Sequence, residues 1–165
     1  MFNFHDSAKK PDFENKIVFW DLDGTLAPFR FNGHICDPDG SRHSVSLTEI
    51  DDGIYFERTP SKFMQKLLSD CNSRENLVIT HCHADKEMRD KHKWLDRHFP
   101  SIKERFIIDE KISKTDTILT FCKSHNLELS EVVFVDDSLH FLQEAEKLRI
   151  PCWHISSLLD YFELE

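Results

Sequence analysis

The sequence lacks any apolar run close to the roughly 20 residues that are needed to span a bilayer. Its opening stretch, MFNFHDSAKKPDFENK, also lacks the unbroken apolar segment of a secretion signal. There is no internal repeat and no low-complexity tract. From the sequence alone we therefore expect a cytoplasmic protein with no membrane partner.

Paired cysteines and clusters of basic residues are missing as well. The five cysteines are scattered without a CxxC pair, which favours reduced thiols over a disulfide framework or a zinc site. The formal charge is -9, and the Lys and Arg residues are dispersed. We do not expect a nucleic-acid partner, because such a surface would repel a phosphate backbone. A small anionic substrate is still compatible, since one metal ion and one lysine can reverse the field inside a pocket.

The length and composition are those of one domain that folds by itself. The chain has 165 residues, of which 39% are hydrophobic and 12% aromatic. This is enough apolar surface to offset the entropy of folding, and too little length for two domains of ordinary size. We predict a single domain over residues 1–165.

Five short apolar runs, rich in β-branched and aromatic side chains, each predict a strand. They cover residues 16–20, 77–80, 105–108, 132–135 and 151–155. Segments with helical spacing follow at 59–68, 85–99, 115–125, 139–148 and 157–162. Thr59 and Pro60 have the pattern of an N-cap and a first-turn proline. Alternating strands and helices predict an α/β fold, with a parallel sheet covered on both faces.

Residues 27–58 interrupt this alternation. The turn sequence DPDG at residues 37–40 lies between two stretches, 33–36 and 44–47, that could pair as a hairpin. We predict that this insertion forms a small flap beside the end of the first strand.

Polar side chains follow three of the predicted strands. They are Asp21 and Asp23 after the first, Thr80 and His81 after the second, and Asp136 and Asp137 after the fourth, with Lys114 placed before the helix that leads into the fourth strand. The carboxyl ends of parallel strands line the ligand site, so these groups are expected to converge. Several carboxylates in one place repel each other unless a hard cation neutralises them. Mg²⁺ fits this role, because it binds carboxylates, backbone oxygen, water and substrate phosphate.

Each of these residue types can perform one part of a phosphoryl transfer. A carboxylate such as Asp21 can attack phosphorus and form an aspartyl-phosphate. Asp23 can protonate the leaving alcohol and then activate water. Thr80 and a lysine can hold the phosphoryl oxygens. Lys114 is the expected lysine, although Lys111 lies one helical turn earlier in spacing and competes with it.

Four segments, VFWDLDGTL, LVITH, SKTDTILTFC and VVFVDDS, resemble in order and spacing the four motifs of the haloacid dehalogenase-like (HAD) superfamily. RIPCWHISS is similar to its usual last strand. The resemblance implies a Rossmann-like three-layer α/β/α sandwich with strand order 3-2-1-4-5. It also implies Mg²⁺ held by Asp21, by the backbone carbonyl of Asp23 and by the acidic motif, in which Asp137 is the expected closer ligand and Asp136 competes with it.

The second aspartate, Asp23, narrows the activity that the resemblance implies. Phosphatases of the superfamily carry an acid there, whereas members that displace halide from carbon do not need one. The single short insertion resembles the capless or minimally capped branch. We therefore predict a magnesium-dependent phosphatase acting on a small phosphate monoester, with Gly24, Thr25 and His81 bordering the substrate.

Several alternatives remain open at this point. The segment KHKWLDRHFP is similar to one in deoxyribonucleotidase-type members, which points toward a nucleotide substrate. A phosphatase acting on polynucleotide ends is a further alternative. The competing hypothesis from another class is a non-catalytic domain of the same fold that binds a phosphorylated ligand or a partner protein.

Overall fold

The computed structural model describes residues 11–28 and 58–159. The predicted hairpin at 33–36 and 44–47, and with it most of the flap, lies outside the described residues. None of the helices in the described part of the chain is long and apolar enough to cross a membrane.

The described residues form a parallel sheet of five strands in the order β3-β2-β1-β4-β5. This confirms the predicted fold class and strand order. The strands are β1 (Ile17–Trp20), β2 (Glu75–Cys82), β3 (Arg105–Asp109), β4 (Val132–Asp136) and β5 (Cys152–His154). In the register, Trp20 at the end of β1 pairs with Val78 of β2 and Val135 of β4, so β1 and β4 end side by side and β2 continues beyond them to Cys82.

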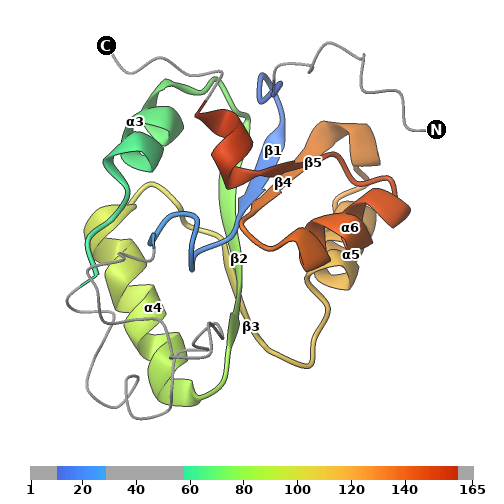
Figure 1. Cartoon of the computed structure of the whole chain (residues 1–165). Coiled ribbons are helices and arrows are strands. Elements are labelled where there is room, and N and C mark those ends of the chain that lie inside the picture. The colour runs from blue at the N-terminus through green and yellow to red at the C-terminus, as the bar shows by residue number, and fades with distance from the viewer. Residues whose placement is uncertain (1–10, 29–57, 160–165) are drawn as a thin grey trace, which may run out of the picture.

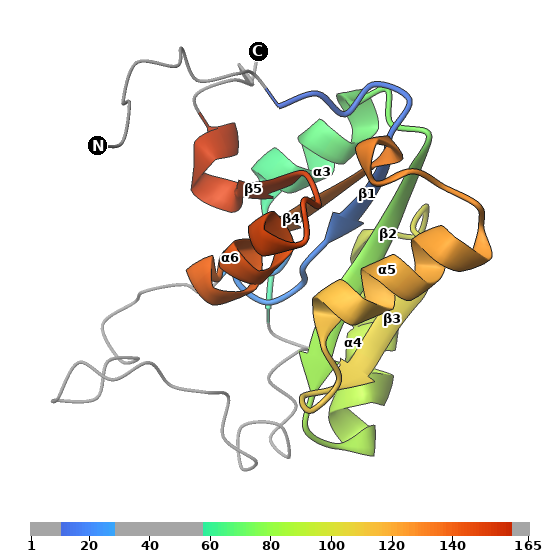
Figure 2. The same ribbon diagram turned by 90° about the vertical axis from the view of Figure 1, so that its right-hand side faces the viewer.

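Helices cover both faces of this sheet. The helices α3 (Lys62–Asp70) and α4 (Asp85–His98) lie on one face, and α5 (Lys114–Ser124) and α6 (Leu139–Lys147) lie on the other (Figures 1 and 2). Two 3₁₀ turns, η1 (Leu129–Glu131) and η2 (Ile155–Leu158), complete the described elements. The arrangement is a three-layer α/β/α sandwich.

The side chains of β1 alternate between two hydrophobic cores, as the geometry of a strand requires. Val18 and Trp20 belong to the core beneath α3 and α4, and Ile17 and Phe19 belong to the core beneath α5 and α6. The indole Nε1 of Trp20 donates a hydrogen bond of 2.9 Å to Asn76 Oδ1. Trp20 is a core residue, as expected, and it also joins β1 to β2.

Several predicted boundaries are wrong by a few residues. Helix α3 begins at Lys62, and its N-cap is Ser61, whose hydroxyl accepts from the Met64 N–H at 3.2 Å. Thr59 and Pro60 precede it. Strand β2 starts before residue 77 and continues past residue 80, because its pairing with β3 extends to Cys82. At residues 157–158 the short turn η2 replaces the predicted last helix, whose remaining residues reach the part of the chain that is not described.

Candidate active site

Asp21 and Asp136 lie side by side because β1 and β4 are neighbouring strands. The Asp21 N–H donates to Val135 O at 2.8 Å, which continues the ladder between the two strands by one residue. Asp21 therefore lies beside Asp136, the last residue of β4. Both residues are almost fully buried, with exposed fractions of 3% and 1%.

A tight turn after β1 brings Asp137 against the backbone of the first acidic segment. The turn is closed by hydrogen bonds from Gly24 N to Ala27 O and from Ala27 N to Leu22 O. Gly24 has a φ of +86°, and a Cβ at this position would lie 2.3 Å from Asp137 Oδ2. Glycine is required here for two reasons, its left-handed backbone and the close approach of this carboxylate.

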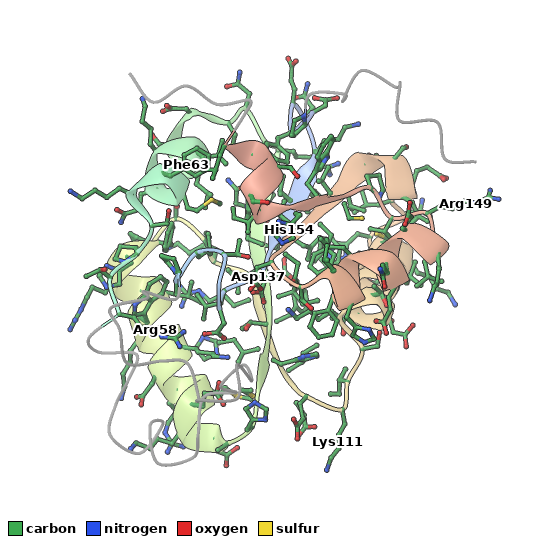
Figure 3. All side chains as sticks on the ribbon, in the orientation of Figure 1. Arg58, Phe63, Lys111, Asp137, Arg149 and His154 are labelled. Atoms are coloured by element: carbon green, nitrogen blue, oxygen red, sulfur yellow. The ribbon has the colours of Figure 1, made fainter. Side chains whose placement is uncertain are left out.

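Asp21, Asp136 and Asp137 form one cluster. Each offers a carboxylate oxygen, and these oxygens all lie within 4.8 Å of one another. Asp137 lies near the centre of the molecule in Figure 3, close to His154, whose ring nitrogen is 2.9 Å from the Asp137 carbonyl oxygen. Asp136 and Asp137 thus both place a carboxylate next to Asp21, and the cluster of three could hold a cation.

The structure brings Lys114 to this cluster and leaves Lys111 outside it. Lys114 is the first residue of α5, with Ser113 as the N-cap. Its Nζ lies 2.6 Å from Asp21 Oδ1 and 2.8 Å from Asp136 Oδ2. Lys111 is exposed on the preceding loop and points away from the carboxylates (Figure 3).

Charge is unevenly balanced in the cluster. Burial raises the pKa of Asp21 well above its usual range, Lys114 opposes this rise, and Asp136 and Asp23 add to it. Burial alone would lower the pKa of Lys114, but Asp21 and Asp136 outweigh it and raise that pKa. Lys114 is therefore charged, yet one ammonium does not compensate all the acids around Asp21. The site favours the binding of a further positive charge.

The Asp23 carboxylate forms ion pairs with two cations. Arg58 Nη1 lies 2.5 Å from Asp23 Oδ1, and Lys91 Nζ of α4 lies 2.8 Å from Oδ2. Neither cation was expected at the site from the sequence. Two signals in the sequence pointed to Lys91. One is its i,i+4 spacing from Glu87, although such pairs normally lie on the surface of a helix, and the other is its place in the segment KHKWLDRHFP.

The other predicted site residues lie around these carboxylates. Thr80 is buried in β2, and its hydroxyl is 3.4 Å from Asp23 Oδ2. His81 Nε2 is 2.9 Å from Ile112 O, and burial lowers the pKa of this imidazole. Thr25 is buried, and within the described chain its Oγ1 has no hydrogen-bond partner.

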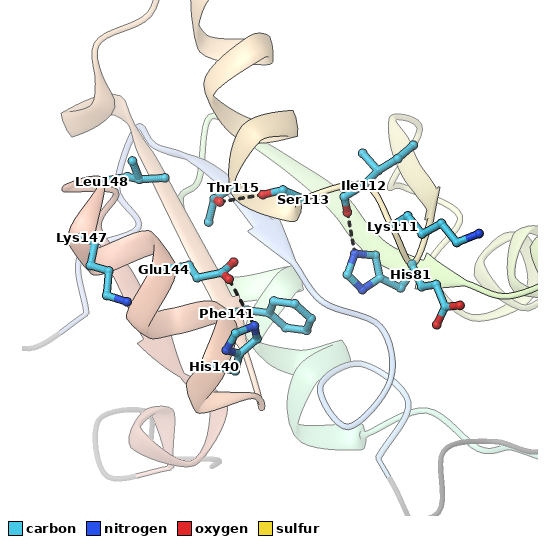
Figure 4. Close-up of a pocket in the computed structure, with 11 residues that line it drawn as sticks. His81, Lys111, Ile112, Ser113, Thr115, His140, Phe141, Glu144, Lys147 and Leu148 are labelled. Carbon is cyan, nitrogen blue, oxygen red and sulfur yellow. Dashed lines mark hydrogen bonds and ion pairs between the residues drawn. The ribbon is translucent and has the colours of Figure 1, made fainter.

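A pocket of about 400 Å³ borders the site between the start of α5 and helix α6 (Figure 4). His81 and Phe141 lie on its wall, next to Thr80 and Lys114. His81 follows Thr80 in the chain, and the Phe141 ring centroid is 4.5 Å from Lys114 Nζ. The carboxylates of the cluster and Lys114 do not themselves line this pocket.

Comparison with known proteins shows similarity in structure only. No protein-family model matches the chain, and no curated protein matches it significantly. Among solved structures, one similar protein is a HAD family enzyme from Bacteroides thetaiotaomicron, an aspartate-to-alanine mutant in complex with magnesium and inorganic phosphate. Its TM-score is 0.52 at 13% identity, over 84% of this chain and 92% of that chain.

Two further structures show lower scores. The N-terminal part of a Bacteroides fragilis protein, containing a phosphatase domain complexed with Mg, has a TM-score of 0.48 at 14% identity, over 92% of this chain and 41% of that one. A 3-deoxy-D-manno-octulosonate 8-phosphate phosphatase from Moraxella catarrhalis has a TM-score of 0.42 at 18% identity, over 82% of this chain and 63% of that one. At such identities the similarity to the Bacteroides thetaiotaomicron enzyme establishes the fold alone, and that fold is HAD-like.

Proposed function

We propose that this protein is a magnesium-dependent phosphatase of the HAD superfamily, which hydrolyses a small phosphate monoester through an aspartyl-phosphate. The observation that carries the proposal is the convergence of Asp21, Asp136 and Asp137 beside the buried ammonium of Lys114. In the same proposal residues 1–165 form one domain, with 27–58 as a flap over the site.

The residues of the cluster fit Mg²⁺. All three side-chain donors are carboxylate oxygens, which Mg²⁺ prefers over nitrogen or sulfur ligands. Three carboxylates gather around the single ammonium of Lys114, so the cluster is short of positive charge. Asp21, Asp136 and Asp137 would hold the ion, with the backbone carbonyl of Asp23 as a further ligand. When bound, Mg²⁺ would neutralise charge on the phosphoryl oxygens.

In the proposed reaction, a carboxylate oxygen of Asp21 attacks phosphorus as the bond to the ester oxygen breaks. Asp23 gives its proton to that oxygen, and the alcohol leaves. Asp23 then takes a proton from water, which attacks the aspartyl-phosphate and releases phosphate. Lys114 and the Thr80 hydroxyl hold phosphoryl oxygens, and Lys114 is already within hydrogen-bond distance of the nucleophile.

The proposal is tested by the hydrolysis of p-nitrophenyl phosphate with and without Mg²⁺. We expect turnover that EDTA abolishes, that Mg²⁺ restores, and that Asp21→Asn eliminates. A folded wild-type protein that shows no turnover with any divalent metal would instead favour the non-catalytic binding domain.

A screen of phosphorylated metabolites would then identify the substrate. Nucleoside monophosphates belong in it, because the segment around Lys91 and Trp94 is similar to that of deoxyribonucleotidase-type enzymes. His81 and Phe141 also offer ring surfaces at the pocket beside the site.

A further inference from the structure

Lys91 is a charged residue in the interior of the protein, and the reaction described above does not use it. It lies on α4, and its side chain is 1% exposed. Its Nζ lies 2.8 Å from Glu87 Oε1 and 2.8 Å from Asp23 Oδ2. Its other acceptors are the carbonyl oxygen of His81 and, at 3.4 Å, the hydroxyl of Thr80.

These contacts engage all the N–H groups of the Lys91 ammonium, so none is left to donate to a substrate. An ammonium has three N–H groups, and four acceptors already surround this one. Lys91 is therefore placed to act on Asp23 and Thr80 and not directly on a phosphate. In this it differs from Lys114, whose partners are the nucleophile and Asp136.

Glu87 fixes the position of this ammonium. One of its oxygens pairs with Lys91, and the other accepts from the His83 N–H at 2.7 Å. The Lys91 and Glu87 pair thus connects the turn after β1 with the end of β2 and with α4, which follows β2 in the chain. Because Lys91 and Glu87 are both buried and hydrogen-bonded, this pair holds Asp23 in one orientation.

Helix α4 also anchors the second cation on Asp23. The indole Nε1 of Trp94 donates to the carbonyl oxygen of Arg58 at 2.8 Å, and Arg58 contacts Asp23 Oδ1. The two Asp23 oxygens are therefore held differently. Oδ2 faces the fully buried Lys91, and Oδ1 faces Arg58, the last residue of the insertion 27–58.

We propose that Lys91, held by Glu87, is a positioning residue that orients Asp23 for proton transfer to the leaving group. Oδ2 stays on Lys91, and Oδ1 carries the proton that passes to the ester oxygen as the phosphorus–oxygen bond breaks. Arg58 exchanges its contact with Oδ1 for one with the anionic substrate. This inference rests on the proposed phosphatase function and adds a residue that acts through Asp23.

The test compares two substrates with different leaving groups. Nitrophenolate leaves with little help from an acid, whereas the alkoxide of glycerol phosphate needs a proton. The variant Lys91→Met with Glu87→Gln removes the ammonium and keeps the local charge balanced. We expect kcat/KM to fall about 10- to 100-fold more for glycerol phosphate than for p-nitrophenyl phosphate. This is less than the roughly 100- to 10,000-fold that a general acid contributes, because Asp23 itself is still present.

Two comparisons separate positioning from a purely structural role. In an Asp23→Asn background, the same pair of substitutions should cause no further difference between the two substrates, because Lys91 acts through Asp23. Lys93→Met removes an exposed lysine of the same helix and should leave both activities unchanged. Lys91→Arg keeps the charge with a different shape. We expect it also to lose more activity on glycerol phosphate than on p-nitrophenyl phosphate, but by a smaller factor.

Equal losses on both substrates in the folded double variant, or in Lys91→Arg if the double variant does not fold, would overturn the inference and leave the phosphatase proposal standing. Wild-type protein that hydrolyses neither substrate would overturn the proposed function itself, and the inference with it.

Discussion

Replacing Gly24 with alanine tests how closely the two acidic segments approach each other. The added Cβ would lie 2.3 Å from Asp137 Oδ2 and 2.4 Å from its Cγ, whereas ordinary contacts begin at 3.4 Å. The Asp137 carboxylate would have to withdraw by about 1 Å. Since Mg²⁺ binds oxygen at about 2.0–2.1 Å and tolerates little distortion, a shift of this size removes the carboxylate from the proposed metal site.

The expected effect has two parts. The backbone at Gly24 has a φ of +86°, and the left-handed conformation costs other residues about 1–2 kcal/mol. In a chain of this length, each kcal/mol lowers the unfolding temperature by about 2–4 °C. The displacement of Asp137 should in addition weaken Mg²⁺ binding by about 10- to 100-fold, as is typical when the support of a metal ligand is lost.

The assay is the Mg²⁺ concentration dependence of phosphatase activity, together with thermal unfolding with and without Mg²⁺. The control combines Gly24→Ala with Asp137→Ala. Without a carboxylate to displace, Gly24→Ala should then lower the unfolding temperature through backbone strain only and leave Mg²⁺ binding as it is in Asp137→Ala. If Gly24→Ala alone bound Mg²⁺ as tightly as the wild type, Asp137 would not be a ligand in the arrangement described.

Three other predictions concern charge and packing. Because the pKa of Asp21 is raised, the folded state binds its proton more tightly than the unfolded chain, so this residue costs stability as the pH rises above its ordinary pKa of 3.8. In metal-free buffer at pH 7, Asp21→Asn should therefore unfold at a higher temperature than the wild type, and the difference should vanish below pH 3.8. Lys114→Met should lower kcat/KM for p-nitrophenyl phosphate by at least about 100-fold, whereas Lys111→Met should leave it unchanged; equal losses would refute the assignment. Trp20→Phe removes the hydrogen bond to Asn76 and should cost about 1–3 kcal/mol in urea unfolding, and an unchanged midpoint would contradict it.

Local patterns in the sequence predicted the sheet and the identity of its polar strand ends. Residues 17–20 and 132–135 are continuous apolar runs, which suit strands buried on both faces. The acids that follow them had to meet once these strands became neighbours in a parallel sheet. Gly24 could be recognised as part of a turn, because glycine adopts a left-handed backbone without strain.

Which cation pairs with each aspartate depends on packing between elements that are distant in the sequence, so only the tertiary structure decides it. Lys114 was the expected lysine because it stands directly before a predicted helix, and Lys111 competed with it. In the structure α5 begins at Lys114, with Ser113 as its N-cap, and this places the Lys114 ammonium against Asp21. Lys91 resembles any charged residue of a surface helix, yet α4 packs against the sheet with this residue inward. Spacing along a helix specifies a face, but the burial of that face depends on contacts that a local pattern does not contain.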